Sequence, residues 1–187
     1  MQSVSEDTIK TFGRCLPTIK IGDSLWLSHD FDFDDCGDGI LNNGTTYYTW
    51  DAVQRVVSKM DGWHLPSVQE WNDACEAVGF KSMYHNRFLG QPQDFNDPGL
   101  RLYSGCDLQK VLGIYPIGLY DEDKKLSEVG WNTAYWSATD SQPYNGDIPS
   151  PNAYCRGFGK PADVCTVHDM WLPKTLYLPV RLVKDCP

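Results

Sequence analysis

The first clear pattern of apolar and polar positions runs from Thr18 to Leu27, where apolar residues alternate on either side of a Gly22-Asp23 pair. A period of two is typical of a strand with one buried face, and a Gly-Asp pair favours a tight turn. We therefore expect a β-hairpin over residues 18–27. Residues 1–17 are expected to form an N-terminal lead-in segment that precedes the domain. Residues 28–46, rich in Asp, Gly and Asn, predict a surface loop.

Two segments carry the spacing of amphipathic helices. Over residues 50–60 the apolar positions recur at intervals of three and four, and Thr49 is placed to cap the first turn. A second helix is expected to begin after Ser67, because Glu70 three residues later completes a capping box. Gly79 is expected to end it.

The remaining pattern predicts strands and turns. Residues 81–110 indicate irregular structure. Short strands are expected at residues 112–120, 133–138, 153–158, 163–167 and 176–183, between turns that contain Asp, Gly, Pro and Asn. Two helices combined with many short strands predict an α+β fold. A chain of 187 residues suits a single domain, which we place at residues 18–187.

The charge and the apolar runs bear on possible partners. The net charge is −9, and phosphate binding needs clustered Lys and Arg, so a nucleic-acid partner is not expected. The apolar runs are too short to span a bilayer, so membrane insertion is not expected. The first residues show neither the basic nor the apolar segment of a secretory signal peptide. Either the protein does not use that route, or the chain begins after the signal.

The cysteines give a weak signal. They are Cys15, Cys36, Cys75, Cys106, Cys155, Cys165 and Cys186. An odd number without a Cys-x-x-Cys pair is a poor disulfide framework and a poor zinc signature. We expect free thiols, with a bridge such as Cys15 to Cys186 left open if the two ends of the domain meet. No metal and no cofactor are expected.

An acidic segment in the first loop raises the question of calcium. Its aspartates are Asp30, Asp32, Asp34, Asp35 and Asp38. An EF-hand loop requires a glutamate at its twelfth position, and Leu41 occupies that position when the count begins at Asp30. A solvated acidic loop is therefore the favoured interpretation.

Four blocks of sequence, in a fixed order, resemble a known family. The blocks are Lys20-Ile21-Gly22-Asp23 with Trp26; Tyr48-Thr49-Trp50-Asp51-Ala52; Gly62-Trp63-His64-Leu65-Pro66-Ser67 with Glu70-Trp71; and Tyr135-Trp136-Ser137-Ala138-Thr139 with the closing Pro179-Val180-Arg181-Leu182-Val183-Lys184-Asp185. Together they resemble the Fibrobacter succinogenes major paralogous domain family, a bacterial and phage branch of the C-type-lectin-like fold. The resemblance implies two helices packed on short, mostly antiparallel strands with long loops. It also implies neighbouring termini and a first hairpin paired with the strand at 176–183.

The family is similar in layout to the variable proteins of diversity-generating retroelements, in which a reverse transcriptase rewrites one C-terminal cassette. The resemblance implies that residues 140–178 are this cassette, or else surface loops of fixed sequence. Alternation along residues 152–158 would place Tyr154 and Arg156 on one side of a strand. Tyr, Trp, Asn, Asp, Arg and His are typical of adaptable recognition surfaces. The candidate ligand-binding residues are Tyr144, Asn145, Asp147, Asn152, Tyr154, Arg156, His168, Asp169 and Trp171.

The tryptophans are expected to serve the scaffold. They are Trp26, Trp50, Trp63, Trp71, Trp131 and Trp136, which we place in the core. His64 is interpreted as part of a turn before a capped helix, because no nucleophile and base have convincing spacing around it. No catalytic residue is assigned.

The sequence therefore predicts a non-enzymatic protein that binds a protein or glycan ligand, on a phage virion or a bacterial cell surface. One alternative is a fixed-sequence adhesin module. Another is a calcium-dependent lectin, for which Trp71-Asn72-Asp73 and Gln91-Pro92-Gln93-Asp94 offer loose motifs. A third is an oxidase of the formylglycine-generating type, which would use Cys155 and Cys165 and rests on likeness of fold alone.

Overall fold

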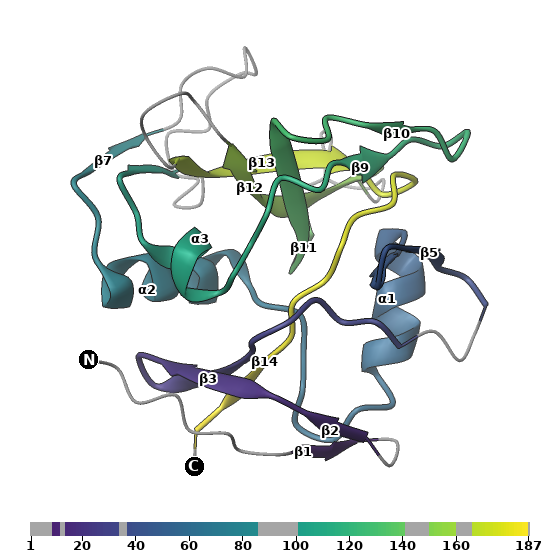
Figure 1. The fold of residues 1–187 in the computed structure, drawn as a ribbon, viewed down its shortest axis with the longest axis horizontal. Coiled ribbons are helices and arrows are strands. Elements are labelled where there is room, and N and C mark those ends of the chain that lie inside the picture. The colour runs from purple at the N-terminus through teal and green to yellow at the C-terminus, as the bar shows by residue number, and fades with distance from the viewer. Residues whose placement is uncertain are drawn as a thin grey trace.

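The computed structural model describes residues 9–11, 14–33, 37–85, 101–140, 150–159 and 166–186. These residues form a mixed α+β structure, and every strand pair among them is antiparallel (Figure 1). The α+β class expected from the sequence is therefore confirmed.

The described residues contain three helices and fourteen strands. The helices are α1 (Trp50–Val57), α2 (Val68–Val78) and α3 (Leu108–Val111). The strands are β1 (Ile9–Thr11), β2 (Arg14–Leu16), β3 (Thr18–Ile21), β4 (Ser24–Leu27), β5 (Ile40–Asn42), β6 (Thr45–Tyr47), β7 (Ser82–His85), β8 (Arg101–Ser104), β9 (Leu119–Tyr120), β10 (Leu126–Ser127), β11 (Asn132–Asp140), β12 (Asn152–Gly159), β13 (Thr166–Pro173) and β14 (Val183–Asp185).

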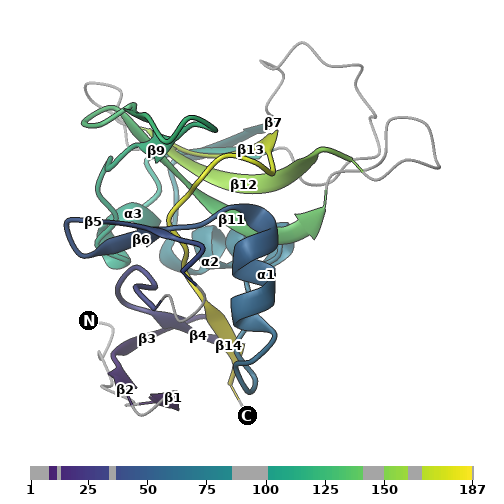
Figure 2. The same ribbon diagram turned by 90° about the vertical axis from the view of Figure 1, so that its right-hand side faces the viewer.

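Two sheets organise the molecule. The larger has five strands in the order β11-β12-β13-β8-β7, and the smaller has three in the order β14-β4-β3. Figures 1 and 2 show the larger sheet at one end of the molecule and the smaller at the other, with the helices between them. The chain after β13 runs the length of the molecule before it enters β14. The larger sheet is thereby tied to the first hairpin.

The first hairpin forms as the sequence predicts. Strands β3 and β4 pair around Gly22, whose φ of 60° favours glycine. The expected pairing with the C-terminal strand is also present, with Val183 opposite Trp26. That strand, β14, has only three residues, Val183–Asp185, whereas the sequence pattern predicted a strand at residues 176–183. The preceding segment is held by isolated bridges such as Tyr48 with Leu178.

The helix caps are confirmed. Thr49 accepts a hydrogen bond from the amide of Ala52, and α1 ends at Val57, three residues earlier than expected. At α2, both bonds of the capping box between Ser67 and Glu70 are present. Both motifs are short-range, and a cap that satisfies the first amides of a helix needs no tertiary contact.

Other expected elements are corrected by the structure. The loop expected at 28–46 contains the β5–β6 hairpin, and the irregular segment expected at 81–110 contains β7, β8 and α3. Of the strand expected at 112–120, only β9 exists, and the strand expected at 163–167 extends from Thr166 to Pro173. Strand β8 pairs with β13 far along the chain, so the local pattern does not fix it.

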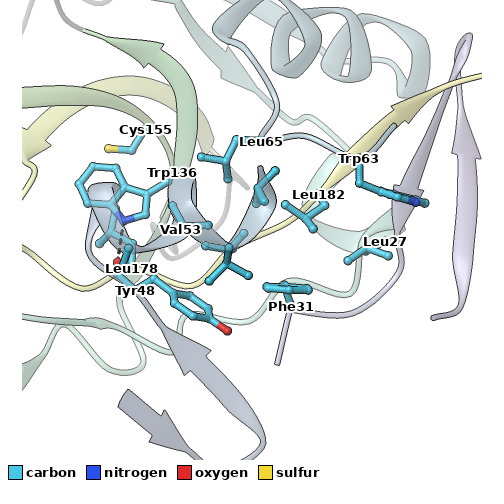
Figure 3. Packing of buried hydrophobic residues seen from close by; sticks show 14 of the residues in the cluster. Leu27, Phe31, Tyr48, Val53, Trp63, Leu65, Trp136, Cys155, Leu178 and Leu182 are labelled. Atoms are coloured by element: carbon cyan, nitrogen blue, oxygen red, sulfur yellow. Dashed lines mark hydrogen bonds between the residues drawn. The ribbon is translucent and has the colours of Figure 1, made fainter. Parts of the chain in front are cut away.

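The core lies on both faces of β11 and β12. On one face, Trp136 packs with α1 and with the chain that leads to β14, and its Nε1 donates to the Tyr48 carbonyl at 2.7 Å (Figure 3). On the other face, Trp71 of α2 packs edge-on against Phe158, with ring centroids 5.8 Å apart. Strands β11 and β12 are therefore covered on both sides.

The tryptophan expectations hold in four cases. Trp26, Trp63, Trp71 and Trp136 are buried. Trp50 is only partly buried. Trp131 is 70% exposed, so its placement in the core was wrong. It lies immediately before β11, and nothing in the local pattern distinguishes it from the buried tryptophan five residues later.

Candidate functional site

The strands that carry the candidate ligand-binding residues are mostly interior. Tyr154 is 6% exposed, Arg156 0% and Asp169 1%. The expectation that these side chains are displayed is therefore wrong. Strand β12 lies between β11 and β13, and its side chains meet α2 on one face and the α1 cluster on the other. An alternating strand exposes one face only when that face is uncovered.

Arg156 and Asp169 form an ion pair inside the sheet. Arg156 Nη2 lies 2.6 Å from Asp169 Oδ1, and the same nitrogen donates to the Asn72 side chain at 2.7 Å. Asp169 Oδ2 accepts from the Arg101 amide at 2.8 Å. The pair thus joins α2, β12, β13 and β8. Its geometry is that of a structural connection, because no solvent reaches either group.

His168 lies on the opposite face of the sheet from this pair. An added Cβ at Gly157 would lie 2.6 Å from His168 Nε2 and 3.0 Å from the Met170 sulfur, so the ring rests over the glycine. Burial, with a contribution from the Arg156 charge, lowers the pKa of His168 to about 4. The ring is uncharged at neutral pH and only partly exposed. His168 is therefore poorly placed to contact a ligand at the surface.

The remaining candidates gather at one end of the larger sheet. Asn152 pairs with Pro173, and Tyr154 packs edge-on against the partly exposed Trp171 at 6.3 Å. At the same end, Asp140 closes β11 and pairs with Lys174 at 2.9 Å. We call Asp140, Asn152, Tyr154, Trp171 and Lys174 the sheet end.

Lys174, which no pattern in the sequence assigns to the candidate surface, contacts two residues of this region. Its ammonium lies 4.3 Å from the centroid of the Trp50 ring as well as against Asp140. Trp50 Nε1 donates to the Ser137 carbonyl at 2.9 Å, which fixes the ring. Lys174 and Asp140 are 34 residues apart. No local spacing signals a contact over that distance.

Three of the candidate residues, Tyr144, Asn145 and Asp147, lie outside the described residues. The structure describes the residues that flank them in the chain, Asp140 and Ser150.

A second segment outside the described residues also joins two strands of the larger sheet. The segment 86–100 follows β7 and returns at Arg101, and in the sheet His85 pairs with Arg101. The Arg101 amide donates to Asp169, two residues before Trp171. Of the described residues on either side of this segment, Arg101 therefore lies next to β13 on its way to Trp171, and His85 lies beside Arg101.

Comparison with protein-family models, with curated proteins and with solved structures finds no match for this chain. Within the described part of the chain, no helix is long and apolar enough to cross a membrane.

The acidic loop is engaged in structural contacts. Asp30 accepts from Arg181 Nε at 3.0 Å, from the Tyr135 hydroxyl at 2.8 Å and from Thr45 at 3.1 Å. Asp38 pairs with the Arg55 guanidinium at 2.6 Å. Asp34 and Asp35 lie outside the described residues. Among the residues that are described, no group of three His, Cys, Asp or Glu could hold a metal ion.

The loose lectin motif is also accounted for structurally. Trp71 and Asn72 are buried within α2, and Asn72 accepts from Arg156. The side-chain amide of Gln69 donates to the carboxylate of the exposed Asp73 at 2.7 Å. The second motif, Gln91 to Asp94, lies outside the described residues. The part of these motifs that can be examined thus belongs to the scaffold.

Neither of the residues considered for chemistry has the surroundings of a reactive group. Burial raises the pKa of the Cys155 thiol well above its ordinary value, and the thiol donates to the Met170 carbonyl. Its proposed partner, Cys165, lies outside the described residues. His64 Nε2 lies 2.6 Å from Glu70, and this bond raises the pKa of His64. His64 therefore supports the capping box of α2.

A separate hollow of about 520 Å³ lies beside the first hairpin. Its lining includes Leu27, Ser28, Asp30, Thr45 and Arg181. Asp30 and Arg181 bind each other, and His29 and Asp32 also line the hollow. The Asp30 and Arg181 charges are therefore engaged in contacts of the scaffold.

Proposed function

We propose that the protein is a non-enzymatic ligand-binding module with a C-type-lectin-like fold, and that the sheet end is its binding surface. The observation that carries the proposal is the contrast within one pair of strands. Arg156 and Asp169 are locked in the interior, whereas Asn152 and Trp171, on the same two strands, are partly exposed. Binding surfaces are commonly loops held on a rigid scaffold.

The chemistry of the sheet end suits recognition by complementarity. Trp171 provides a large ring whose orientation is fixed against Tyr154, and Asn152 provides amide donors and acceptors. The candidate residues Tyr144 and Asp147, which follow Asp140 in the sequence, would add an aromatic group and a carboxylate if they take part in binding. Aromatic and amide groups of this kind are enriched in binding surfaces for proteins and are suited to polar ligands such as glycans. We propose a protein or glycan on a cell surface as the ligand, reached from a phage virion or a bacterial surface.

The antiparallel pairing of the first hairpin with the C-terminal strand supports the lectin-like assignment. Strand β14 pairs with β4, and Arg181 just before it donates to the Leu27 carbonyl at 2.9 Å. The two ends of the domain are thereby joined. Arg181 belongs to the closing block of the family resemblance. Its bonds to Leu27 and Asp30 give a structural reason for an arginine at this position of the block.

The test uses labelled protein on an array of bacterial surface polysaccharides and on intact bacterial cells. We expect binding to at least one surface, and a loss of about tenfold or more in affinity for Trp171→Ala, as for an aromatic anchor. Trp131→Ala is the matched control, because Trp131 is exposed and precedes β11 at the opposite end of that strand from Asp140. Binding that survives Trp171→Ala and is abolished by Trp131→Ala would place the surface elsewhere.

The retroelement origin is a separate part of the proposal, and sequencing of the locus across a natural population tests it. We expect substitutions at positions 144, 145 and 147 and at Asn152. Arg156 and Asp169 should be constant, because a change at either leaves a buried charge without its partner. Variation spread evenly over the chain, or an invariant segment 141–152, would contradict diversification while leaving the binding proposal open.

A further inference from the structure

Two cysteines that the sequence pattern treated as isolated are in contact. Cys75 lies in α2 and Cys106 follows β8, 31 residues later in the chain. Their thiols are hydrogen-bonded to each other, and Cys106 Sγ lies 3.9 Å from the Cys75 carbonyl oxygen. Both are buried and both are free thiols in this structure. The contact brings the helix and the β8–α3 connection together at one point.

The surroundings of the two thiols differ. The hydrogen bond from Cys75 lowers the pKa of Cys106, and the Leu108 amide and the Arg156 charge act in the same direction. The same hydrogen bond, together with burial, raises the pKa of Cys75. Arg156 is fully buried, and its Nε and Nη1 have no hydrogen-bond partner among the described residues. A thiolate on Cys106 is thus better stabilised than one on Cys75.

We propose that Cys75 and Cys106 are a modification site, at which a low-molecular-weight disulfide such as oxidised glutathione converts the two thiols into a structural disulfide. The Cys106 thiolate attacks the glutathione disulfide, forms a mixed disulfide and releases one reduced glutathione. The Cys75 thiol then loses its proton to the solution and attacks the Cys106 sulfur, which releases the second. Two protein thiols are oxidised and one glutathione disulfide is reduced, as in ordinary thiol–disulfide exchange.

The other thiols with described side chains lack such a neighbour. Cys155 lies on the other face of the larger sheet and donates to the Met170 carbonyl at 3.6 Å. Cys186 is free beside the first hairpin, where its amide donates to the Asp23 carbonyl. The Cys15 side chain lies outside the described ones, so the Cys15–Cys186 bridge that the sequence left open stays untested. Oxidation is therefore expected to select Cys75 and Cys106.

Because both thiols are buried, the full chain is unfolded, reduced and refolded in glutathione redox buffer, with a reduced sample alongside. Trypsin places each of the seven cysteines in a different peptide, with Cys75 in residues 60–81 and Cys106 in residues 102–110. Mass spectrometry is expected to find these two peptides joined, with the loss of two hydrogen atoms, only in the oxidised sample. The disulfide should raise the melting temperature by roughly 5–10 °C, since it closes a loop of moderate length.

Cys155→Ala is the control variant, which should still form the bridge. Cys106→Ser should lose both the joined peptide and the redox-dependent rise in melting temperature. The wild-type peptide map decides the matter even if a variant fails to fold. Oxidised wild-type protein in which residues 60–81 and 102–110 stay separate, or in which either joins another cysteine peptide, would overturn the proposal. The outcome does not depend on the identity of the ligand.

Discussion

Arg156 and Asp169 face each other across β12 and β13 with 2.6 Å between Nη2 and Oδ1, and both side chains are excluded from solvent. The pair explains how a segment with the composition of a recognition surface can belong to the scaffold. Taking two charges out of water costs several kcal/mol per ion, and only close pairing with added hydrogen bonds offsets that cost. Asn72 supplies one of these bonds and the Arg101 amide another.

Removal of one partner of this pair should be strongly destabilising. For Arg156→Met we expect a loss of about 3–5 kcal/mol in the free energy of unfolding, because Asp169 is left as an unpaired buried charge. The double variant Arg156→Met/Asp169→Leu should recover a large part of the loss. Urea titrations measure both. A single variant within about 1 kcal/mol of wild type would show that the charges are not buried together.

Gly157 is expected to tolerate no side chain. Gly157→Ala places a methyl group against the His168 ring and the Met170 sulfur. Overpacking of this kind costs about 1–3 kcal/mol. In a double-mutant cycle, the cost of Gly157→Ala should fall when His168→Ala removes the ring. An equal cost in both backgrounds would mean that the ring does not cover the glycine.

His168 should make the protein less stable in mild acid. Its pKa is about 4 in the folded protein against 6.5 for the unfolded chain, because of burial and the Arg156 charge. The unfolded chain therefore takes up the proton first. The stabilising contribution is complete above pH 6.5, decreases as the pH falls, and is gone near pH 4. The total is roughly 3 kcal/mol.

The measurement is the free energy of unfolding in urea at several pH values between 4 and 7.5, for wild type and for His168→Gln. Carboxylates titrate in the same range, so the difference between the two slopes carries the information. The variant should show the flatter profile. Identical pH profiles for the two proteins would refute the depressed pKa of His168.

The two tryptophans on either side of the β11 start should differ in their contribution. Trp136→Ala removes a fully buried ring and is expected to cost about 3–5 kcal/mol. Trp131→Ala removes a ring that is 70% exposed and should change stability by less than about 0.5 kcal/mol. Thermal and urea unfolding provide the comparison. Similar losses for both would contradict the boundary between core and surface at this strand.

The sequence alone determined the features whose hydrogen bonds are local. The Thr49 cap bonds to Ala52, and the Ser67–Glu70 box closes within three residues. The Gly22-Asp23 turn sets the register of the first hairpin in the same way. Each of these motifs satisfies its own backbone groups, so a short stretch of chain carries all the information needed.

Only the tertiary structure decided which polar side chains are inside. The bond from Arg156 to Asn72 spans 84 residues, and the contact between Cys75 and Cys106 spans 31. Alternation along β12 separated its two faces correctly but could not show that α2 covers one and α1 the other. Whether a strand's second face is exposed depends on which distant element packs on it, and the pattern within the strand does not record that.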